Sequence, residues 1–589
     1  MSGGAAASRL ELNFLWLDHA IGLFTLAEGA AAVAILTLAW AAPRLGAGVF
    51  AGIERRLARL ANHPTRQILA VGLLALLARA ALLPWLGAPE PLIHDEQSLL
   101  LQARTFMQGR LANPPHPFWE HFETFHVNQL PAYSSAFFPG RSAPLVIGLF
   151  LFDHAWLGIW LSVVLMCMAA VWMLQAWVGG RFALLGGVLV VVRLGIYSYW
   201  TNSYWGGAFT ALGAMLVLGA LPRILRQPTW GLGVLMGIGA AMLMISRPYE
   251  GGLLCLPVAA VLLVRLLRPA WAGGRMAFLR VALPSGAFIA AGGVLLLAFN
   301  AAATGDPLKT PYDVNRQTYA TAPAFLVSPP VPSLERGPAY FRDFYRAESA
   351  SYDRVGSFPQ LARSVATKLF HSWNFHVGPI FTLALLAGLW SARRDLFLLG
   401  TLAFFAAGYL LETWHYPHYT APIYPVLLIL LLRGFEWLRP RQWRGRPSGL
   451  FLTRAMPAAA IVLLALPTGT VVWGVPSLQN NLHSNSCCAI RDSADFNLRD
   501  ALERQLIASP GRDLVLVRDG PHNPIHYELV WNAPDIDASE IVWARRLSPA
   551  RDEALLAHFA GRRVWEFEWL PPPGDHSFGP ANAPRSATQ

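Results

Sequence analysis

The segment from residue 94 to residue 126 concentrates carboxylates and imidazoles in a chain where only 14% of residues are charged. It opens with the run His94-Asp95-Glu96. A second group follows further along, consisting of Glu120, His121, Glu123 and His126. A carboxylate can take a proton from a hydroxyl group as a general base, and imidazoles can bind polar substrates or metal ions. The sequence therefore marks this segment as the candidate reaction centre.

Two other interpretations of these residues exist. Residues 121–126 have the spacing H-x-E-x-x-H, whereas zinc peptidases use H-E-x-x-H, so we expect no required metal and keep a divalent cation as an alternative. We instead expect the histidines of both groups to line the substrate site.

The structural alternative for Asp95 is to cap the N-terminus of a helix predicted over 99–107, with Glu96 as an acid in its first turn.

The composition places these residues in a membrane protein. The chain has 589 residues, of which 54% are hydrophobic, and its mean hydropathy is +0.39. Soluble proteins carry about 25% charged residues, and the apolar residues here form blocks of about 20, long enough to cross a bilayer. The net charge of +11 comes mainly from arginines between these blocks, which is typical of topology-setting loops and excludes nucleic-acid binding as the main function.

The apolar blocks predict an α-helical polytopic membrane protein with about twelve transmembrane helices. The predicted spans are residues 22–42, 67–87, 154–176, 182–199, 205–221, 230–246, 252–268, 281–301, 377–391, 395–412, 420–437 and 455–475. Because the arginines gather in alternate connecting segments, the positive-inside rule places those segments in the cytoplasm and both chain ends outside the inner membrane. A cleaved signal peptide ending at Ala41 is the alternative for the first block, but the residues before that block lack a basic region.

Three large segments fall on the extracytoplasmic side: the loops 88–153 and 302–376 and the tail 476–589. We expect an N-terminal part, residues 1–66, with one extra helix and a cytoplasmic basic segment, followed by a membrane domain, residues 67–475. The tail combines helical and strand patterns and predicts a small α/β domain. Its predicted elements are helices near 492–508 and 549–559 and strands at 513–517, 541–543 and 564–567. We therefore expect the chemistry on the outer face of the membrane.

The arrangement resembles the GT-C superfamily of glycosyltransferases, and within it the branch of protein O-mannosyltransferases and lipid A aminoarabinose transferases. The likeness rests on an Asp-Glu pair after an early membrane helix, at the start of a large outer loop, and on the stretches 109–115 and 120–126. It covers residues 67–437 loosely. Relatives often carry a Lys/Tyr-Pro-Pro element near the end of this loop, where this chain has Phe137-Phe138-Pro139-Gly140-Arg141. The resemblance implies that Asp95 is the catalytic carboxylate.

The resemblance also implies a reaction. The protein would move a hexose or pentose from a polyprenyl-phosphate carrier to a hydroxyl group of a cell-envelope glycan, lipid or protein, with inversion at the anomeric carbon. Asp95 would act as the base, supported by Glu96, Glu120 or Glu123, and no cofactor would be required. The alternatives are an enzyme that joins or polymerises lipid-linked glycans, and a transporter or flippase. A transporter would need ionisable residues deep in several spans and broken helix pairs.

The departing phosphate of such a reaction needs cations. Candidates toward the outer ends of the spans and in the outer turns are Arg79, Arg193, Arg247 and Lys309. His418 and Tyr419, in another outer turn, are candidates for binding the phosphate or the sugar. A charge within a span is costly and usually has a partner or a function. We expect at least one of these residues to bind the lipid phosphate. The alternative is snorkelling or structural pairing, for example between Arg247 and Glu250.

Overall fold

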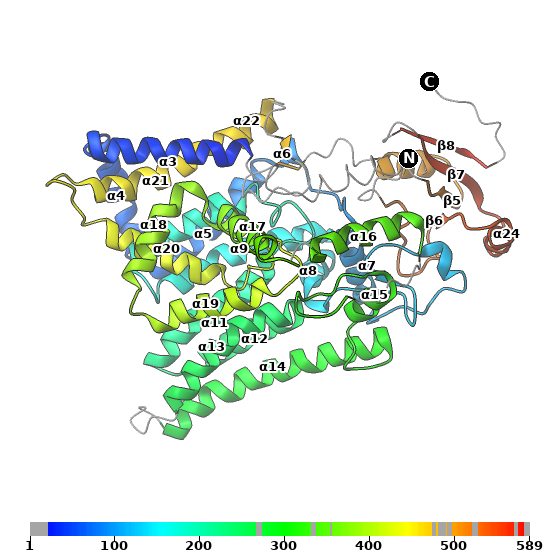
Figure 1. Ribbon diagram of the computed structural model, residues 1–589, viewed down its shortest axis with the longest axis horizontal. Coiled ribbons are helices and arrows are strands. Elements are labelled where there is room, and N and C mark those ends of the chain that lie inside the picture. The colour runs from blue at the N-terminus through cyan, green and yellow to red at the C-terminus, as the bar shows by residue number, and fades with distance from the viewer. Residues whose placement is uncertain are drawn as a thin grey trace. The chain divides into compact units, whose positions relative to one another are not determined.

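The computed structural model divides into two compact units (Figure 1). The first unit comprises residues 1–89, 156–294 and 356–491, and the second comprises residues 90–155, 295–355 and 492–589. The second unit thus gathers segments of both large outer loops with the tail, although these segments are far apart in the sequence. The structure describes residues 22–266, 274–330, 337–353, 356–473, 479–480, 490–491, 498–520, 528–570 and 575–581.

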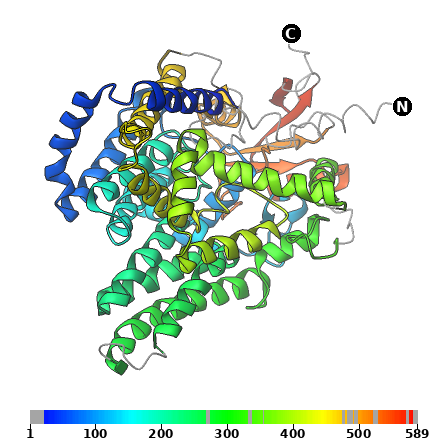
Figure 2. The same ribbon diagram turned by 60° about the vertical axis from the view of Figure 1, so that its left-hand side comes forward.

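The first unit is a bundle of helices. Its elements are α3 (Leu23–Ala41), α4 (Ala47–Ala61), α5 (Pro64–Ala80), α6 (Leu83–Leu86), α9 (Ala155–Leu174), α10 (Gly180–Val190), the π-helical turn η3 (Val191–Gly195), α11 (Ala208–Arg226), α12 (Trp230–Ser246), α13 (Pro248–Leu266), most of α14 (Gly274–Thr304), α17 (Phe358–His376), α18 (Gly378–Ser391), α19 (Leu396–Leu410), α20 (Tyr424–Leu438), α21 (Ser448–Leu463), α22 (Ala465–Trp473) and the short parallel strands β3 (Gln479–Asn480) and β4 (Ile490–Arg491). Helix α3 lies along α21, as both Figure 1 and Figure 2 show.

Small residues allow the helices of this bundle to pack closely. Helices α18 and α20 meet at Gly388 and Gly434. A methyl group added to Gly388 would collide with the carbonyl oxygen of Leu430, and one added to Gly434 would collide with that of Ala384. Such close backbone approach is typical of helices that associate within a membrane.

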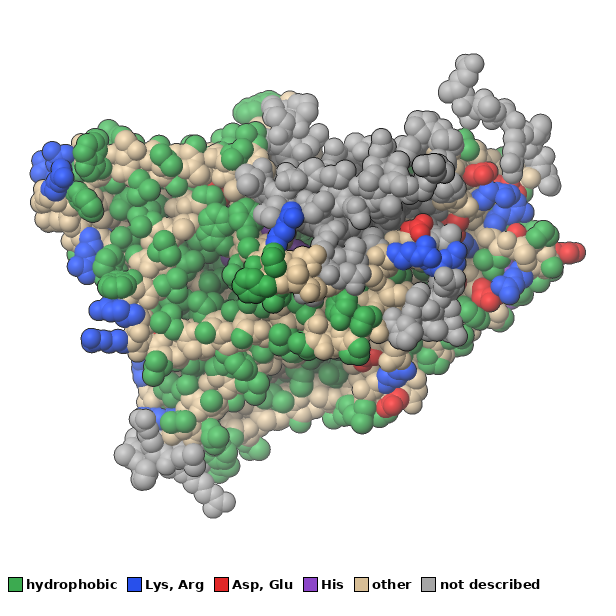
Figure 3. All heavy atoms as spheres, in the orientation of Figure 1, with side chains coloured by type: hydrophobic (Ala, Val, Ile, Leu, Met, Phe, Trp, Pro, Cys, Tyr) green, Lys and Arg blue, Asp and Glu red, His purple; other side chains and the backbone are tan. Residues whose placement is uncertain are grey.

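The predicted membrane spans coincide with helices, but the count of twelve is not confirmed. Among the described residues, six helices are long and apolar enough to cross a membrane, or seven if α17 and α18, bent by 99°, form one broken span. The remaining blocks form shorter helices, such as α12 at 17 residues and α19 at 15 residues. Hydrophobic side chains cover the flank of the bundle, and basic side chains gather at one end, beside α4 (Figure 3).

The second unit combines short loop helices with a mixed sheet. Its loop elements are α7 (His94–Met107), the 3-10 turn η1 (Trp119–Phe122), β1 (Val127–Asn128), β2 (Ser134–Ser135), the 3-10 turn η2 (Pro139–Arg141), α8 (Ala143–Phe152), α15 (Pro311–Tyr319) and α16 (Ala339–Asp353). Its tail elements are α23 (Leu498–Ile507), β5 (Asp513–Arg518), β6 (Ile541–Arg545), α24 (Pro549–His558), β7 (Arg563–Leu570) and β8 (Asp575–Pro580). These include a helix or strand at each position predicted for the tail, except that residues 492–497 of the first predicted helix lie outside the described residues.

The sheet has the strand order β6-β5-β7-β8, with β5 parallel to both neighbours and β8 antiparallel to β7. Strand β5 is a continuous apolar run because both of its faces are buried. Leu514 and Leu516 pack in one cluster with Leu555 of α24, and Val515 and Val517 pack in another with α23. The first cluster also contains Leu101 of α7, so the first outer loop shares a hydrophobic core with the tail.

Candidate active site

Helix α7 begins immediately before the predicted carboxylates. Ile93 occupies the N-cap position, and His94 is the first helical residue. The fully buried Glu96 carboxylate accepts hydrogen bonds from the backbone N–H groups of Leu92 and Ile93, at 2.8 and 3.1 Å. Glu96 therefore satisfies N–H groups at the start of the helix. The structural alternative for Asp95 is wrong, since Asp95 is not the N-cap residue, whereas Glu96 is the first-turn acid that we predicted.

Asp95 lies at the centre of a polar group. Its Oδ2 atom is 3.1 Å from Nδ1 of His94 and 3.7 Å from Nε2 of His126, and its side chain is 18% exposed. Burial acts to raise the pKa of Asp95, but the two imidazoles and the Arg141 guanidinium outweigh burial and hold this pKa well below its usual value. Burial lowers the pKa of His126 to about 3. At neutral pH the site thus holds an ionised, solvent-accessible carboxylate beside a neutral imidazole.

The backbone of His126 is held in an unusual conformation. Its φ angle is 57°, in the left-handed region that non-glycine residues rarely adopt. Its carbonyl oxygen accepts hydrogen bonds from the Ser98 hydroxyl, at 2.7 Å, and from the Ala136 N–H, at 2.9 Å. Ser98 belongs to α7, and Ala136 directly follows β2. Helix α7 and the antiparallel pair β1–β2 therefore both fix the backbone of His126, from which the imidazole reaches Asp95.

The second outer loop supplies an aromatic wall to the same site. Phe344 of α16 packs against His94, with ring centroids 5.5 Å apart, and against Phe125, at 4.9 Å. A buried ion pair joins α15 to α16, with 2.8 Å between Arg316 and Glu348. These contacts place apolar surface around the carboxylate, where electrostatic interactions are stronger than in water.

Arg141 occupies the place of the missing Lys/Tyr-Pro-Pro element. Its guanidinium lies over the Phe137 ring at 4.1 Å and contributes to the lowered pKa of Asp95. The unit that contains the carboxylate thus also provides a cation near it.

The other predicted carboxylates and His121 make contacts of a different kind. Glu120 forms an exposed ion pair with Arg551 of α24, at 2.7 Å. Glu123 accepts a hydrogen bond from the Tyr319 hydroxyl at 2.8 Å. His121 places Nδ1 2.7 Å from the carbonyl oxygen of Arg545. Of the H-x-E-x-x-H residues, only His126 contacts Asp95, and the others attach the loop to α15 and to the tail.

His94, Asp95 and His126 also form a possible metal-binding group. One ligand atom from each lies within 4.8 Å of the other two. Two imidazole nitrogens and a carboxylate oxygen are a donor set that suits zinc and similar divalent ions. A cation held there would polarise a bound hydroxyl group. The sequence spacing had pointed away from a metal at residues 121–126, and the structure brings together a different trio.

A second trio of this kind joins the first outer loop to the tail. Oδ1 of Asp537 lies 3.1 Å from Nε2 of His116 and 2.9 Å from Nε2 of His558. The backbone N–H of Phe118 donates to Nδ1 of His116 at 3.0 Å. In a neutral His116 the proton is therefore on Nε2, where it donates to Asp537. This tautomer is opposite to the one that a metal on Nε2 requires, so the trio is a hydrogen-bonded link.

Within the first unit, protein groups surround the predicted phosphate ligand Arg79. Its side chain is fully buried, with Nε donating to the Asn202 amide oxygen at 2.9 Å and Nη2 donating to the Gly87 carbonyl at 2.7 Å. The guanidinium also lies 4.7 Å from the Trp156 ring. No carboxylate contacts it among the described residues. These contacts engage two of its nitrogens, whereas Nη1 is buried without a hydrogen-bond partner among the described residues, so Arg79 stays a candidate phosphate ligand.

Arg193 forms a buried ion pair. Its Nη1 atom lies 2.6 Å from the Glu28 carboxylate of α3, and its guanidinium also donates to the carbonyl oxygens of Phe375 and Asn374. A paired buried arginine of this kind is a structural element, because removal of either partner leaves an uncompensated charge. We therefore do not include Arg193 in the proposed phosphate site.

Arg247, His418 and Tyr419 lie together. Arg247 occupies the break between α12 and α13, with Nη1 2.5 Å from the Glu250 carboxylate and its guanidinium 4.1 Å from the Tyr419 ring. The His418 ring lies 5.0 Å from that of Tyr419, and its Nδ1 atom is 3.0 Å from the Tyr199 hydroxyl. The predicted Arg247–Glu250 pair is thus present within a cluster of aromatic and basic groups.

The sequence assigned no role to Lys368, which belongs to the same polar network. Its side chain is 1% exposed, and the ammonium donates to the carbonyl oxygens of Leu410 and Glu412. The Glu412 carboxylate interacts electrostatically with both Lys368 and Arg247. The sequence feature that distinguishes Lys368 is its residue type, because it is one of only two lysines in an arginine-rich chain.

Lys309, the other lysine, belongs to the second unit. The turn that carries it is fixed by hydrogen bonds from the Thr304 hydroxyl to the Lys309 carbonyl, at 3.1 Å, and from the Leu308 N–H to Asp306, at 2.8 Å. Within the described parts of the chain, its ammonium has no ion pair. The turn therefore presents a cation that is available to a ligand.

Comparison with known proteins gives structural similarities only. Neither the protein-family models nor the curated proteins provide a match. The solved structures that resemble this chain include ArnT from Cupriavidus metallidurans in the apo state, with 13% identity, a TM-score of 0.46 and coverage of 85% of this chain and 93% of that chain. An Archaeoglobus fulgidus oligosaccharyltransferase in complex with Zn and sulfate has 11% identity, a TM-score of 0.41 and coverage of 85% and 67%.

Proposed function

We propose that this protein is a glycosyltransferase that moves a sugar from a polyprenyl-phosphate-linked donor to an acceptor hydroxyl at the outer face of the cytoplasmic membrane. The observation that carries the proposal is the state of Asp95. Its carboxylate is ionised at neutral pH, 18% exposed and fixed at the start of α7 beside His94 and His126. An ionised carboxylate that solvent can reach is able to accept a proton from a bound hydroxyl group.

The proposed reaction is a single displacement. Asp95 takes the proton of the acceptor hydroxyl as the hydroxyl oxygen forms a bond to the anomeric carbon of the sugar. The bond between that carbon and the phosphate oxygen breaks, and the polyprenyl phosphate leaves with the electron pair. Attack from the side opposite the phosphate inverts the anomeric configuration. The nearby Arg141 guanidinium and the Lys309 ammonium, both in the unit of Asp95, are the proposed cations for the departing phosphate.

The cluster of Arg247, His418 and Tyr419 is the proposed anion-binding group of the helical unit. Arg247 is charge-paired with Glu250, and Lys368, a second buried cation, interacts with the Glu412 carboxylate of the same network. A buried polar network within membrane helices is costly and usually functional. We propose that this cluster binds an anionic group, with Lys368 added to the residues expected from sequence.

The test is donor hydrolysis, in which water takes the place of the acceptor. Purified full-length protein in detergent is incubated with a panel of short-chain polyprenyl-phosphate sugars, and released polyprenyl phosphate is measured. We expect one donor to be cleaved and Asp95→Asn to lower the rate by about 10²- to 10⁴-fold. The matched carboxylate control is Glu553→Gln, at an exposed position of α24, and it should keep the wild-type rate of donor hydrolysis. Unchanged cleavage by Asp95→Asn would remove Asp95 from the mechanism.

The same assay separates the other candidate functions. Cleavage of diphosphate-linked glycans alone would favour an enzyme that joins or polymerises such glycans. Transfer of intact lipid-linked sugar across vesicle membranes without cleavage would favour a flippase. Chelation with EDTA tests the trio around Asp95. If a cation is required there, its removal would abolish cleavage and its addition would restore cleavage. Cleavage that resists EDTA is the result expected from the displacement proposed here.

A further inference from the structure

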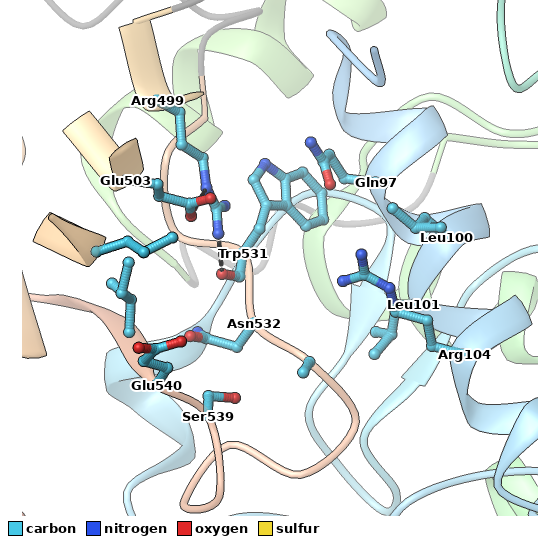
Figure 4. A pocket seen from close by; sticks show the side chains of 13 residues that line it. Gln97, Leu100, Leu101, Arg104, Arg499, Glu503, Trp531, Asn532, Ser539 and Glu540 are labelled. Atoms are coloured by element: carbon cyan, nitrogen blue, oxygen red, sulfur yellow. Dashed lines mark hydrogen bonds and ion pairs between the residues drawn. The ribbon is translucent and has the colours of Figure 1, made fainter. Parts of the chain in front are cut away.

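A pocket lies within the second unit, between α7 and the tail (Figure 4). Its volume is about 290 Å³, near the lower end of the range for small-molecule sites. Helix α7 lines it with Gln97, Leu100 and Arg104. The tail lines it with Arg499, Trp531 and Glu540. In Figure 4 the side chains of Gln97 and Trp531 approach each other across the top of this space.

The pocket is on the opposite side of α7 from the candidate base. Gln97, Leu100 and Arg104 follow the spacing of one helix face. Asp95 lies on the other face, because it precedes Gln97 by two residues and two residues turn an α-helix by about 200°. The Asp95 face also carries Ser98, whose hydroxyl donates to the carbonyl oxygen of His126. Helix α7 thus separates two distinct sites, and the pocket is not part of the group around Asp95.

The tail side of the pocket is rigidly built. Arg499 donates to the Glu503 carboxylate at 2.8 Å and to the carbonyl oxygens of Leu529 and Trp531 at 3.0 and 2.8 Å. The Trp531 indole N–H donates to the Glu528 carbonyl at 2.8 Å. Side chains locked by such contacts provide a preformed surface, which lowers the entropy cost of binding.

The lining chemistry indicates the class of ligand. The cations Arg104 and Arg499 are balanced by the carboxylates of Glu503 and Glu540, so the pocket has no excess charge to select an anion. Guanidinium donors and carboxylate acceptors alternate there with the apolar surface of Leu100. A sugar ring has the matching pattern, since its hydroxyl groups donate and accept hydrogen bonds while its C–H faces are apolar.

We propose that this pocket binds a neutral sugar unit of the acceptor glycan, away from the point of transfer. The inference rests on the proposed function, because it identifies the acceptor as a saccharide that extends past α7. An acceptor of several sugars would be long enough to contact both faces of the helix, which is about 10–12 Å across. Binding behind α7 would also stabilise the helix that carries the candidate base.

The test is saturation-transfer NMR on the full-length protein in detergent. The probes are the methyl glycosides of glucose, galactose, mannose and N-acetylglucosamine, together with a neutral tripeptide. We expect at least one glycoside to bind, and Glu540→Ala to weaken its binding about tenfold through loss of charge-assisted hydrogen bonds. Ala533→Trp, which fills the pocket, should abolish binding. Glu553→Ala is the matched control, because Glu553 is exposed on α24 and does not line the pocket.

The outcomes separate this proposal from the proposed function. Donor hydrolysis needs no acceptor, so Glu540→Ala and Ala533→Trp should keep the wild-type hydrolysis rate and melting temperature. Absence of glycoside binding, or equal binding by the Ala533→Trp variant, would overturn the pocket proposal even if donor hydrolysis is intact. Binding of the tripeptide alone would overturn it in favour of a protein acceptor. Glycoside binding that these variants abolish, in a protein that cleaves no donor, would support the pocket and contradict the transferase.

Discussion

His126 approaches Asp95 from a left-handed backbone conformation, with Nε2 of the imidazole 3.7 Å from Oδ2 of the carboxylate. The φ angle of 57° costs free energy in any residue that carries a Cβ atom. Hydrogen bonds from Ser98 and Ala136 to the carbonyl of His126 hold this conformation. Strain of this kind is often found at functional sites, where it positions a side chain.

Substitutions at His126 separate the role of its imidazole from that of its backbone. His126→Asn should fold normally, because asparagine tolerates the left-handed region, and should hydrolyse donor about tenfold more slowly. His126→Val should also lose about 1–3 kcal/mol of stability, because its branched side chain clashes in this conformation. Thermal melts and initial rates of donor hydrolysis measure both effects. A fully active His126→Asn protein would exclude the imidazole from the reaction.

The pKa shifts of these two residues predict a flat rate between pH 5 and pH 8. The pKa of Asp95 is lowered from an already low value, and that of His126 is lowered to about 3, so neither group titrates in this range. Initial rates of donor hydrolysis across the range provide the check. A decline in rate with a midpoint near pH 6.5 would show that a protonated imidazole is inhibitory and would contradict the assignment for His126.

Stability should depend on pH even though the rate does not. The pKa of His126 is about 6.5 in the unfolded state and about 3 in the folded state. At a pH between these values, His126 binds a proton in the unfolded state but not in the folded state. Folding stability should therefore fall as pH falls through this window, by up to about 1.4 kcal/mol per pH unit from this group. The difference between wild-type and His126→Asn melting curves at pH 5 and pH 7 isolates the effect. Identical pH slopes in the two proteins would contradict it.

Glu96 should matter for stability through the start of α7. Glu96→Ala leaves the N–H groups of Leu92 and Ile93 without their acceptor, which costs about 1–3 kcal/mol for a buried group. Glu96→Gln retains an oxygen acceptor and should lose less. The control is Glu120→Ala, which removes only an exposed ion pair with Arg551 and should cost about 0–1 kcal/mol. Equal melting temperatures for the two alanine variants would contradict the capping role.

Local patterns in the sequence predicted the elements well, but they could not identify most long-range partners. Residues 230–246 were predicted as a span and form α12 over the same residues, because hydrophobicity and flanking polar residues define a helix locally. The contact of His94 with Asp95 is also local. His126 joins them only through the β1–β2 hairpin. The partner of Arg193 is Glu28, 165 residues away, and no local pattern indicates which arginine is paired in this way.

Lys309 offers the most direct test of the phosphate prediction, because its ammonium has no ion pair within the described residues and the hydrogen bonds that hold its turn do not use its side chain. Lys309→Gln should therefore leave the melting temperature unchanged. If the ammonium contacts the donor phosphate, the KM for the polyprenyl-phosphate sugar should rise about tenfold, equivalent to about 1.4 kcal/mol. Lys309→Arg keeps the charge and should restore most of the affinity, which distinguishes a charge contact from a change in the turn. An unchanged KM in Lys309→Gln would leave Arg141 as the proposed phosphate cation in the unit of Asp95.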